Sequence, residues 1–335
     1  MHVLRIVLLA FALCIALYAS TTQRMPYLSQ GASNEVAPAV VLEQDNSPSV
    51  INSTARQNLA VLARQRPTPA FAENCSQQLQ FVATSFESVV QAKDFKAQFQ
   101  QDERFADFPI CVNPVIWLRS EQLKCEAENG RKRCDLSSLA KQQFAPNYTH
   151  LVLFLDSGKA YVQDGVMHLD KQDVYSVFIH ELAHFSGFVD EYAVPAELAQ
   201  AYCYEGSLAR APNLVIANEQ ELMLNQDYQL WQTYIAQLNE RALQQKRNNN
   251  VNVTQISLSV SPSSTCDMQD ISSFKPSDRF TFMQYHDVRV IPPIYKYMWK
   301  QQLKQYHHDI DVSRWFEKSA LQHGELKAAN YWANL

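Results

Sequence analysis

Apolar and polar positions divide the chain into three stretches of different pattern. An uncharged apolar run occupies positions 6–19, a stretch rich in Ser, Thr, Asn, Gln and Pro covers 21–70, and from Phe71 onward the pattern is that of a folded domain. A membrane-spanning helix needs about 17–25 apolar residues, more than the first run offers. We therefore expect residues 1–20 to be an export signal peptide or an uncleaved membrane anchor, and residues 21–70 to be a linker or a prosegment.

Beyond residue 71, segments with a strand pattern alternate with segments with a helix pattern. Short runs that are apolar at every position or at every second position are typical of strands, and apolar residues every three or four positions are typical of helices. The pattern predicts strands at 79–84, 115–118 and 150–155, hairpins around Asn129-Gly130 and Asp164-Gly165, and helices at 87–105, 136–144, 195–204, 218–247 and 292–306. Strands interleaved with helices predict an α/β (α+β) fold, which we expect to end in a helical tail at 311–335.

Charge and glycine content narrow the classes of function. Lys and Arg number 29 against 34 Asp and Glu, a net charge of −5, and the longest block of like charge is Arg131–Arg133. Nucleic-acid-binding proteins usually carry a basic stripe, so we expect no nucleic-acid partner. The chain has 7 glycines among 335 residues, which argues against a Gly-rich phosphate-binding loop or a dinucleotide fingerprint.

Six cysteines follow the N-terminal run: Cys75, Cys111, Cys125, Cys134, Cys203 and Cys266. An even number in an exported chain predicts three disulfides, because export leads to an oxidising compartment. The pattern favours Cys125–Cys134, since these residues flank the Asn129-Gly130 turn. It leaves the other four open, with Cys203–Cys266 and Cys75–Cys111 among the alternatives. We expect a protein that is secreted, periplasmic or anchored on the extracytoplasmic side.

The sequence HELAHFSGFVDEY, which begins at His180, carries the main candidate chemistry. On a helix, His180 and His184 lie one turn apart on the same face, so both imidazoles can bind one metal ion. Glu181 is rotated off that face, where it can act as general base on a metal-bound water. Gly187 permits the left-handed conformation that ends a helix and turns the chain back. Asp190 can then supply a third ligand and leave a fourth position open.

The helix that carries this motif has an expected start and an expected buried face. Asp170 is a good N-cap residue for it. Val174, Phe178 and Leu182 recur at four-residue spacing and are expected to face the core. In the same way, Asn218 is expected to cap the long helix at 218–247.

The motif resembles that of the metzincin clan of zinc metallopeptidases, H-E-x-x-H-x-x-G-x-x followed by His or Asp. The matching positions are His180, Glu181, His184, Gly187 and Asp190. An aspartate in the third-ligand position is similar to the snapalysin-like branch, and the tail DEY looks like that of the IgA-specific metallopeptidase-like family. The resemblance implies a metzincin-like zincin fold: a twisted sheet with an active-site helix, and a helical C-terminal subdomain. It also implies a bound Zn²⁺ and peptidase activity.

Members of this clan also carry a methionine-containing turn beneath the metal, and two segments match it. Met283 lies in a Met-x-Tyr sequence and Met268 in a Cys-x-Met sequence. The pattern favours Met283, because the helix expected at 292–306 follows it after a short segment. Tyr285 then lies near the metal, where it would donate a hydrogen bond to a developing oxyanion or bind the ion in the resting state.

The resemblance assigns a zinc metallopeptidase domain to residues 71–310. A helical insertion at about 193–265 interrupts it. This insertion either borders the cleft and influences substrate choice, or is a structural satellite.

The sequence therefore predicts a zinc-dependent endopeptidase that acts on a protein or peptide substrate. Zn²⁺ on the two histidines and Asp190 would activate a water, with Glu181 as general base. One alternative is an exported zinc-containing binding or surface protein without peptidase activity. Another is a gluzincin-type peptidase in which a distant Glu205 or Glu219 replaces Asp190. The sequence indicates neither the oligomeric state nor the bond preference.

Overall fold

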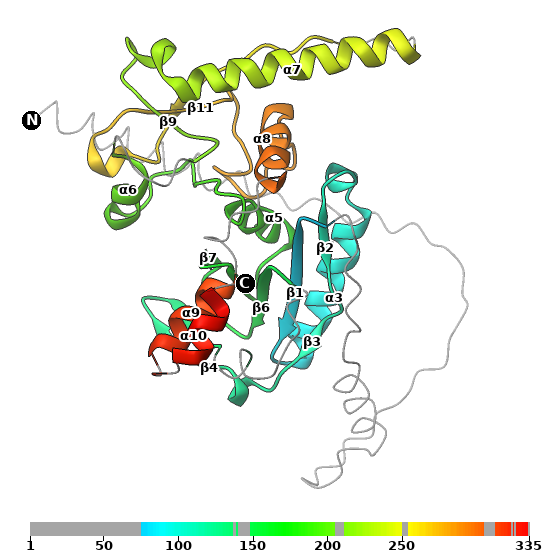
Figure 1. Ribbon diagram of the computed structural model, residues 1–335, viewed down its shortest axis with the longest axis vertical. Coiled ribbons are helices and arrows are strands. Elements are labelled where there is room, and N and C mark those ends of the chain that lie inside the picture. Colours follow the sequence, from blue (N-terminus) through cyan, green and yellow to red (C-terminus); the bar gives the residue numbers. More distant parts are fainter. Residues whose placement is uncertain are drawn as a thin grey trace, which may run out of the picture. The chain divides into compact units, whose positions relative to one another are not determined.

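The computed structural model describes residues 75–136, 139, 148–204, 211–249, 254–304, 312–322, 324 and 326–333. The expected signal or anchor segment, the linker or prosegment, most of the helix expected at 136–144, and Glu205 lie outside these residues. The described chain has the predicted mixed α/β class, with helices packed on both faces of a central sheet (Figure 1).

The central sheet has the strand order β2-β1-β6-β8-β7, and β3 pairs with β1 further along that strand. The strands are β1 (Gln77–Ala83), β2 (Ile110–Val112), β3 (Ile116–Trp117), β6 (His150–Leu155), β7 (Tyr161–Gln163) and β8 (Val166–Asp170). Neighbours run parallel, except that the edge strand β7 is antiparallel to β8. Strand β6 is buried at every position, which explains its nearly uninterrupted apolar sequence, because a central parallel strand is covered on both faces.

Two tight turns have the conformation that their sequences predict. One joins β4 (Lys124–Glu128) to β5 (Arg131–Asp135), and the other joins β7 to β8. Asn129 and Gly130 have φ of 51° and 77°, and Asp164 and Gly165 have φ of 47° and 75°. Both central residues of a type I′ hairpin turn need positive φ, which Asn, Asp and Gly tolerate best. Both predicted hairpins are therefore confirmed.

The six cysteines of the described chain form three disulfides: Cys75–Cys111, Cys125–Cys134 and Cys203–Cys266. The predicted pairing across the Asn-Gly hairpin is confirmed, because Cys125 lies directly opposite Cys134. The sequence left the other two pairs open. Three disulfides indicate an oxidising, extracytoplasmic environment.

One face of the sheet is covered by α3 (Phe86–Gln101), α5 (Tyr175–His184) and α8 (Pro293–Lys304). Aromatic rings join these layers. The ring centroid of Phe178 of α5 lies 5.6 Å from that of Phe81 of β1. The ring centroid of Phe95 of α3 lies 5.7 Å from that of Phe154 of β6, and both pairs have edge-on geometry. Burial of each such side chain stabilises the fold by about 1.5–3 kcal/mol relative to exposure. The helix that carries the motif is thereby fixed against the sheet.

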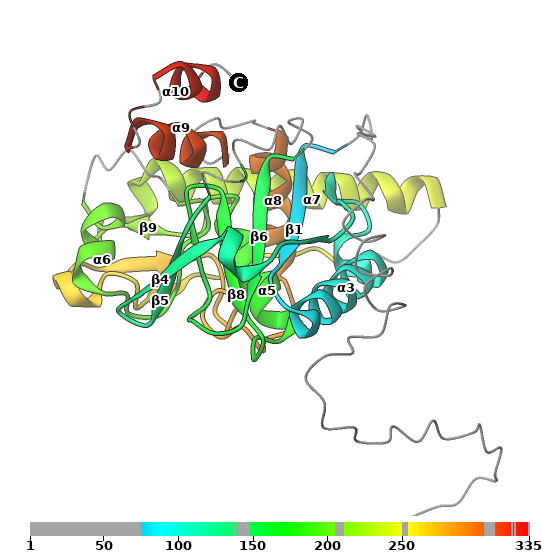
Figure 2. The same ribbon diagram turned by 90° about the horizontal axis from the view of Figure 1, so that it is seen from below.

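The opposite face is covered by α9 (Val312–Gln322) and α10 (Leu326–Ala333), and the expected C-terminal tail is helical there. Phe316 and Trp332 of these helices share a buried cluster with Leu153, Leu155 and Val166 of the sheet. Figure 2 shows both helices on the side of the sheet away from α3. Alternate residues of β6 thus face two different cores, as the pleat of a strand requires.

Between α5 and α8 the chain builds an additional layer with a small core of its own. Its elements are α6 (Ala196–Tyr202), β9 (Val215–Ile216), α7 (Gln226–Asn249), β10 (Ser261–Ser263) and β11 (Ser273–Lys275), and the three strands form an antiparallel sheet in the order β10-β11-β9. Short 3₁₀ helices lie at Glu103–Phe105, Ser120–Gln122, Leu222–Leu224 and Asp267–Gln269. Val189 and Val194, which follow the motif helix, are buried with Leu214 and the Cys203–Cys266 disulfide. The layer is therefore packed against the end of the motif.

The predicted start of the motif helix is wrong. Helix α5 begins at Tyr175 with Val174 as its N-cap, because Asp170 is still paired in strand β8. Asp170 instead accepts hydrogen bonds from the backbone N–H groups of Gln172 and Asp173 in the turn between the strand and the helix. Val174 therefore lies outside the helix and is 51% exposed rather than buried, whereas Phe178 and Leu182 face the core as predicted.

The predicted cap of the long helix is also displaced. Helix α7 begins at Gln226, and Asn225 accepts hydrogen bonds from the N–H groups of Asp227 and Tyr228. Asn218 caps a preceding 3₁₀ turn instead, where it accepts from the N–H of Glu221. A second short turn between the two asparagines explains the shift, because each turn has its own cap.

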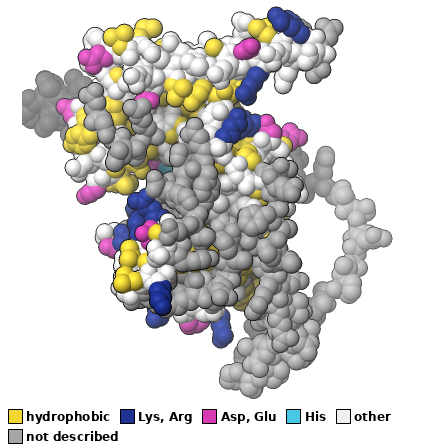
Figure 3. Space-filling view, viewed as in Figure 1, with side chains coloured by type: hydrophobic (Ala, Val, Ile, Leu, Met, Phe, Trp, Pro, Cys, Tyr) yellow, Lys and Arg dark blue, Asp and Glu magenta, His cyan; other side chains and the backbone are white. Residues whose placement is uncertain are grey.

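Charged side chains on the surface occur in small groups of mixed sign. On the face shown in Figure 3, Lys and Arg lie near Asp and Glu over the described part of the chain. Arg133 pairs with Glu128 at 3.0 Å, and Lys318 pairs with Asp164 at 2.6 Å. Exposed pairs of this kind contribute about 0–1 kcal/mol each, so the fold is stabilised chiefly by its apolar layers. Among the described helices, none combines the length and apolarity that a membrane span requires.

Candidate metal centre

The two histidines of the motif lie at the C-terminal end of α5. His180 and His184 are one turn apart, and their ring centroids are separated by 5.0 Å. Gly187 has a φ of +78°, and its N–H donates to the carbonyl of His184 at 3.0 Å. A left-handed residue directly after a helix is the usual device for reversing the chain, and here it brings Asp190 back over the helix end as the sequence predicts.

Two backbone carbonyls orient the imidazoles. Nδ1 of His180 lies 2.8 Å from the carbonyl oxygen of Phe282, and Nδ1 of His184 lies 2.8 Å from that of Phe188. A carbonyl oxygen only accepts, so each Nδ1 must carry the proton that it donates. In the neutral rings the Nε2 atoms are then left with lone pairs that face the same region, which is the tautomer a metal ligand needs.

The carboxylate of Asp190 meets both Nε2 atoms. Its Oδ1 lies 2.9 Å from Nε2 of His180 and 3.3 Å from Nε2 of His184. Ligands of a tetrahedral zinc at about 2.0–2.1 Å are separated by roughly 3.3 Å, so these spacings fit three ligands of one ion. Among the described residues, Oδ1 of Asp190 accepts no hydrogen bond although it is buried. A buried oxygen without a donor, facing two lone pairs, fits a cation at this point.

Glu181 lies beside this group rather than within the ligand set. Its Oε2 is 3.9 Å from Nε2 of His184, it is buried, and among the described residues it also accepts no hydrogen bond. The ligand atoms of His180, Glu181 and His184 all lie within 4.8 Å of one another. A carboxylate at this distance is placed to contact a water bound to the same ion.

Burial and charge shift the titration of the metal-free site. Burial raises the pKa of Glu181, and the neighbouring imidazoles offset part of that effect. Burial opposes a charge on His184, but the nearby carboxylates of Asp190 and Glu181 together raise the pKa of His184 to about 9. Burial likewise opposes the charged form of Asp190, yet its contacts with the imidazoles hold the pKa of Asp190 well below its usual range.

The tyrosine beside the ligands is Tyr192. Its ring lies nearly parallel to that of His180, with centroids 6.5 Å apart. Burial, followed by the charge of Asp190, raises the pKa of Tyr192 well above its ordinary value. Tyr285, the residue proposed from the sequence, is 50% exposed, and among the described residues its ring contacts Phe280. The only sequence signal for Tyr192 is its place in the DEY tail.

Of the two methionine candidates, Met283 lies next to the centre. It is fully buried in a turn closed by hydrogen bonds from Gln284 and Tyr285 to the carbonyl of Thr281. The preceding carbonyl, that of Phe282, is the one that accepts from His180. Met268 is 60% exposed in a 3₁₀ helix. The geometry therefore favours Met283, as the sequence did.

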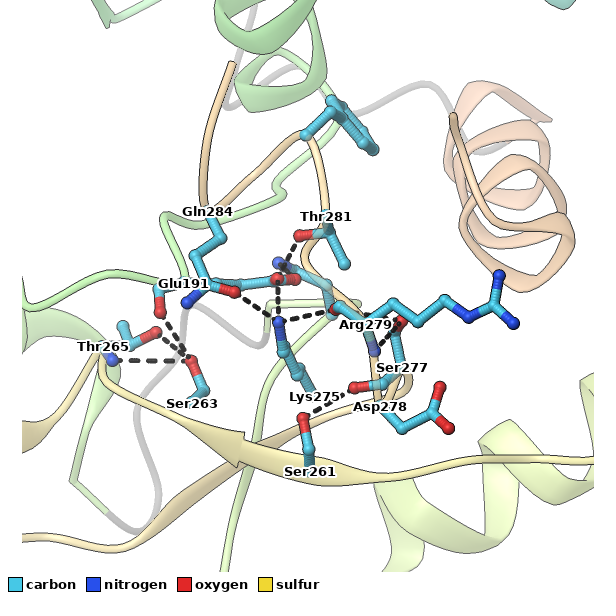
Figure 4. Close-up of polar contacts among 12 residues, drawn as sticks. Glu191, Ser261, Ser263, Thr265, Lys275, Ser277, Asp278, Arg279, Thr281 and Gln284 are labelled. Atoms are coloured by element: carbon cyan, nitrogen blue, oxygen red, sulfur yellow. Dashed lines mark hydrogen bonds and ion pairs between the residues drawn. The ribbon is translucent and has the colours of Figure 1, made fainter. Parts of the chain in front are cut away.

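A buried ion pair involves the residue directly after Asp190, and sequence reasoning missed it. Glu191 is fully buried, with Nζ of Lys275 at 3.6 Å from its Oε2. Figure 4 shows Lys275 pointing at the Glu191 carboxylate from one side and Thr281 from the other. Tyr295 also donates to Oε1 of Glu191 at 2.6 Å. Two charged residues 84 positions apart in sequence give no local signal of this contact.

The distant glutamates proposed as alternative ligands can be compared with Asp190 in part. Glu219 is exposed in a turn before α7. Glu205 lies outside the described residues. Within the described chain, Asp190 is the carboxylate whose oxygen lies within 3.3 Å of both Nε2 atoms.

No family model matches this chain, and no curated protein matches its sequence.

Proposed function

We propose that this chain is a zinc-dependent endopeptidase of an extracytoplasmic compartment, in its secreted, periplasmic or anchored form. The observation that carries the proposal is the convergence of three atoms, Nε2 of His180, Nε2 of His184 and Oδ1 of Asp190, with the orphaned carboxylate of Glu181 beside them. Three ligands plus an adjacent general base form the pattern of a catalytic zinc site, which keeps an open position for water.

A zinc ion held by His180, His184 and Asp190 would supply a Lewis acid and an activated water. Glu181 would take the proton of that water and return it to the leaving amine. Burial supports this role, since it raises the pKa of the Glu181 carboxylate towards the range in which a base both accepts and releases a proton. The carbonyls of Phe282 and Phe188 keep each imidazole in the correct tautomer throughout.

The third ligand affects how the work is divided. A carboxylate in place of a third imidazole makes the ligand set negative by one charge, which weakens the pull of the metal on its water. More of the activation then depends on Glu181. In the same centre, burial and the charge of Asp190 raise the pKa of Tyr192, so its hydroxyl keeps its proton near this negative charge.

The position of β7 at the edge of the central sheet is an argument for a peptide as the substrate. It pairs with β8 on one side in the described chain and lies in the layer next to α5. An extended peptide can add to such an edge through main-chain hydrogen bonds, which bind many sequences because they involve no side chain.

The test combines elemental analysis with cleavage of a broad peptide library by the purified chain. We expect near one zinc per chain and cleavage at internal peptide bonds. Glu181→Gln is the matched variant, because it keeps the shape of the side chain and removes the base. It should retain zinc and melting temperature while cleavage falls about 10² to 10⁴-fold.

Three results would contradict the proposal in different ways. A zinc content in His184→Ala equal to that of wild type would contradict the assignment of the metal site. Zinc without cleavage of any peptide would indicate an exported zinc-containing binding protein. Undiminished cleavage in Glu181→Gln would mean that Glu181 is not the base.

A further inference from the structure

The proposed third ligand lies in a segment that has no regular secondary structure. Residues 188–194 follow Gly187 as an irregular loop before α6 begins at Ala196. An irregular loop has no internal ladder of hydrogen bonds, so a ligand on it is placed precisely enough only if other groups hold the backbone. The bonds of the residues on either side of Asp190 therefore indicate what fixes it.

Asn213 holds the residue before Asp190 with both ends of its amide. The N–H of Val189 donates to Oδ1 of Asn213 at 3.0 Å, and Nδ2 of Asn213 donates to the carbonyl of Val189 at 2.9 Å. Asn213 is fully buried and comes from the additional layer, just before β9. A neighbouring strand would offer the same pair of hydrogen bonds, which a single side chain supplies here.

The same amide also holds the residue after Asp190. Nδ2 of Asn213 lies 2.9 Å from Oε1 of Glu191, to which it donates. The buried carboxylate of Glu191 is further held by Tyr295 and Thr281 and neutralised by Lys275 (Figure 4). Removing one member of such a buried charged network costs several times the free energy that a surface hydrogen bond contributes, because the remaining groups stay desolvated.

Backbone and hydroxyl contacts complete the set. Oγ1 of Thr265 donates to the carbonyl of Asp190 itself at 2.6 Å. The N–H of Glu191 donates to the carbonyl of Met283 at 3.1 Å, and the N–H of Ser264 donates to the carbonyl of Glu191 at 3.2 Å. Each of the three residues from Val189 to Glu191 is thus held by a group distant in sequence.

We infer that Asn213, Glu191 and Thr265 are positioning residues for the metal centre, and that the additional layer exists in part to hold Asp190 in its ligating position. The inference rests on the proposed function, because it treats Asp190 as a metal ligand. It assigns the insertion a role that the sequence left undecided between a wall of the cleft and a structural satellite. The layer acts on Asp190 through the backbone of residues 189–191 and through the side chain of Glu191.

The physical consequence is slow release of the metal. A ligand that is already held in place loses little entropy when the ion binds and returns to it quickly if the bond breaks. Removing the partner of a ligand typically weakens metal affinity about 10–100-fold. We therefore expect the rate of zinc dissociation, rather than the tautomer or the proton transfer, to report on these three residues.

The chain contains a matched control for this test. Asn239 of α7 makes the same two bonds to a single residue: its Nδ2 donates to the carbonyl of Ile256 at 2.8 Å, and its Oδ1 accepts from the N–H of Ile256 at 2.9 Å. It belongs to the same layer but contacts none of residues 189–191. Asn239→Ala removes an equivalent pair of hydrogen bonds away from the centre.

The experiment loads the full chain with zinc and follows transfer of the metal to a chromophoric chelator, well below the melting temperature of each variant. Asn213→Ala should release zinc about 10–100-fold faster than wild type, and Asn239→Ala at the wild-type rate. Thr265→Val, which is nearly isosteric, should release zinc several-fold faster. Hydrogen exchange of the metal-free chains should show faster exchange of the Val189 and Glu191 amides in Asn213→Ala alone.

The outcomes separate this inference from the proposed function. Equal release rates in folded wild type, Asn213→Ala and Thr265→Val would overturn the positioning role while leaving the zinc site intact. If Asn213→Ala fails to fold, the rate in Thr265→Val decides. If the wild-type chain takes up no zinc, the proposed function fails, and the positioning role fails with it. Acceleration of both asparagine variants to the same extent would indicate general destabilisation and would also overturn the inference.

Discussion

At the scale of single residues, two tyrosines near the centre differ in what they contact. The ring of Tyr192 lies along that of His180, and burial and the charge of Asp190 raise the pKa of its hydroxyl. The half-exposed ring of Tyr285 contacts Phe280. A donor on a ligand carboxylate fixes the direction of its lone pairs, whereas a hydroxyl that reaches the substrate only in the transition state leaves the resting metal unaffected.

Tyr192→Phe should therefore accelerate zinc release by about tenfold, because the Asp190 carboxylate loses the neighbouring hydroxyl as a potential donor. Tyr285→Phe should release zinc at the wild-type rate. If Tyr285 donates to the oxyanion as the resemblance implies, its variant should instead lower kcat with little change in KM. Chelator transfer and steady-state kinetics on both variants check this, and faster zinc release in Tyr285→Phe than in Tyr192→Phe would reverse the two roles.

The sequence predicted those site residues whose signal is local. His180, His184 and Gly187 are spaced by the geometry of one helix and its end, so the spacing alone predicts that the imidazoles lie on one face and that the chain turns back. The carbonyl of Phe282 is 102 positions from the ring it orients. Asn213 contacts Glu191 across 22 positions of the chain. Contacts of this kind depend on tertiary folding, and no periodicity in a single sequence reports them.

At the scale of elements, the same distinction holds. Strand β6 and helix α8 were predicted because each has a strong pattern of its own, and the two hairpins because Asn-Gly and Asp-Gly determine the turn. Strand β2 was missed: it has three residues, and its place is set by pairing with β1 and by the Cys75–Cys111 disulfide. The start of α5 was misplaced because pairing of Asp170 in the sheet prevailed over its propensity to cap a helix.

Strand β8 carries a titratable group in an apolar layer. His168 is 1% exposed, and among the described residues neither ring nitrogen has a hydrogen-bond partner. Its ring stacks on that of Tyr161 of β7, with the ring centroids 4.2 Å apart and an interplanar angle of 5°. Burial lowers the pKa of His168 to about 3. A histidine whose pKa is lower in the folded state than in the unfolded state contributes stability that is present above about pH 6.5 and is lost as the pH falls towards 3.

His168→Phe should remove this acid sensitivity, since phenylalanine keeps the stack on Tyr161 and cannot be protonated. When the pH falls from 8 to 5, protonation of this one residue in the unfolded chain lowers the free energy of unfolding of the wild type by about 2 kcal/mol. The free energy of unfolding of the variant relative to wild type should thus rise by that amount over the same interval. Urea denaturation at the two pH values measures it, and a constant difference would show that the ring is not held neutral in the fold.

At the scale of the whole molecule, the three disulfides lie in three different parts of the fold. Cys75–Cys111 joins the start of β1 to the sheet edge at β2, Cys125–Cys134 crosses the β4–β5 hairpin, and Cys203–Cys266 lies in the core of the additional layer. Only the last is adjacent to the groups that hold Asp190, because Thr265 precedes Cys266 directly. We therefore expect an oxidising compartment to matter for the proposed centre as well as for the fold.

Removing Cys203–Cys266 as the Cys203→Ser, Cys266→Ser double variant should affect both stability and the metal. Its loop spans 63 residues and that of Cys75–Cys111 spans 36. On a chain-entropy estimate both disulfides stabilise the fold by about 4 kcal/mol, so the Cys75→Ser, Cys111→Ser double variant is a control of equal thermodynamic weight.

The two double variants should lose melting temperature to a similar extent. Zinc release, followed at a temperature where both are folded, should accelerate about tenfold or more in the first, because Thr265 and Asn213 are no longer held to one another through the layer, and remain at the wild-type rate in the second. The same release rate in both would mean that the layer is held at the centre without its disulfide, and that export is needed for the stability of the fold alone.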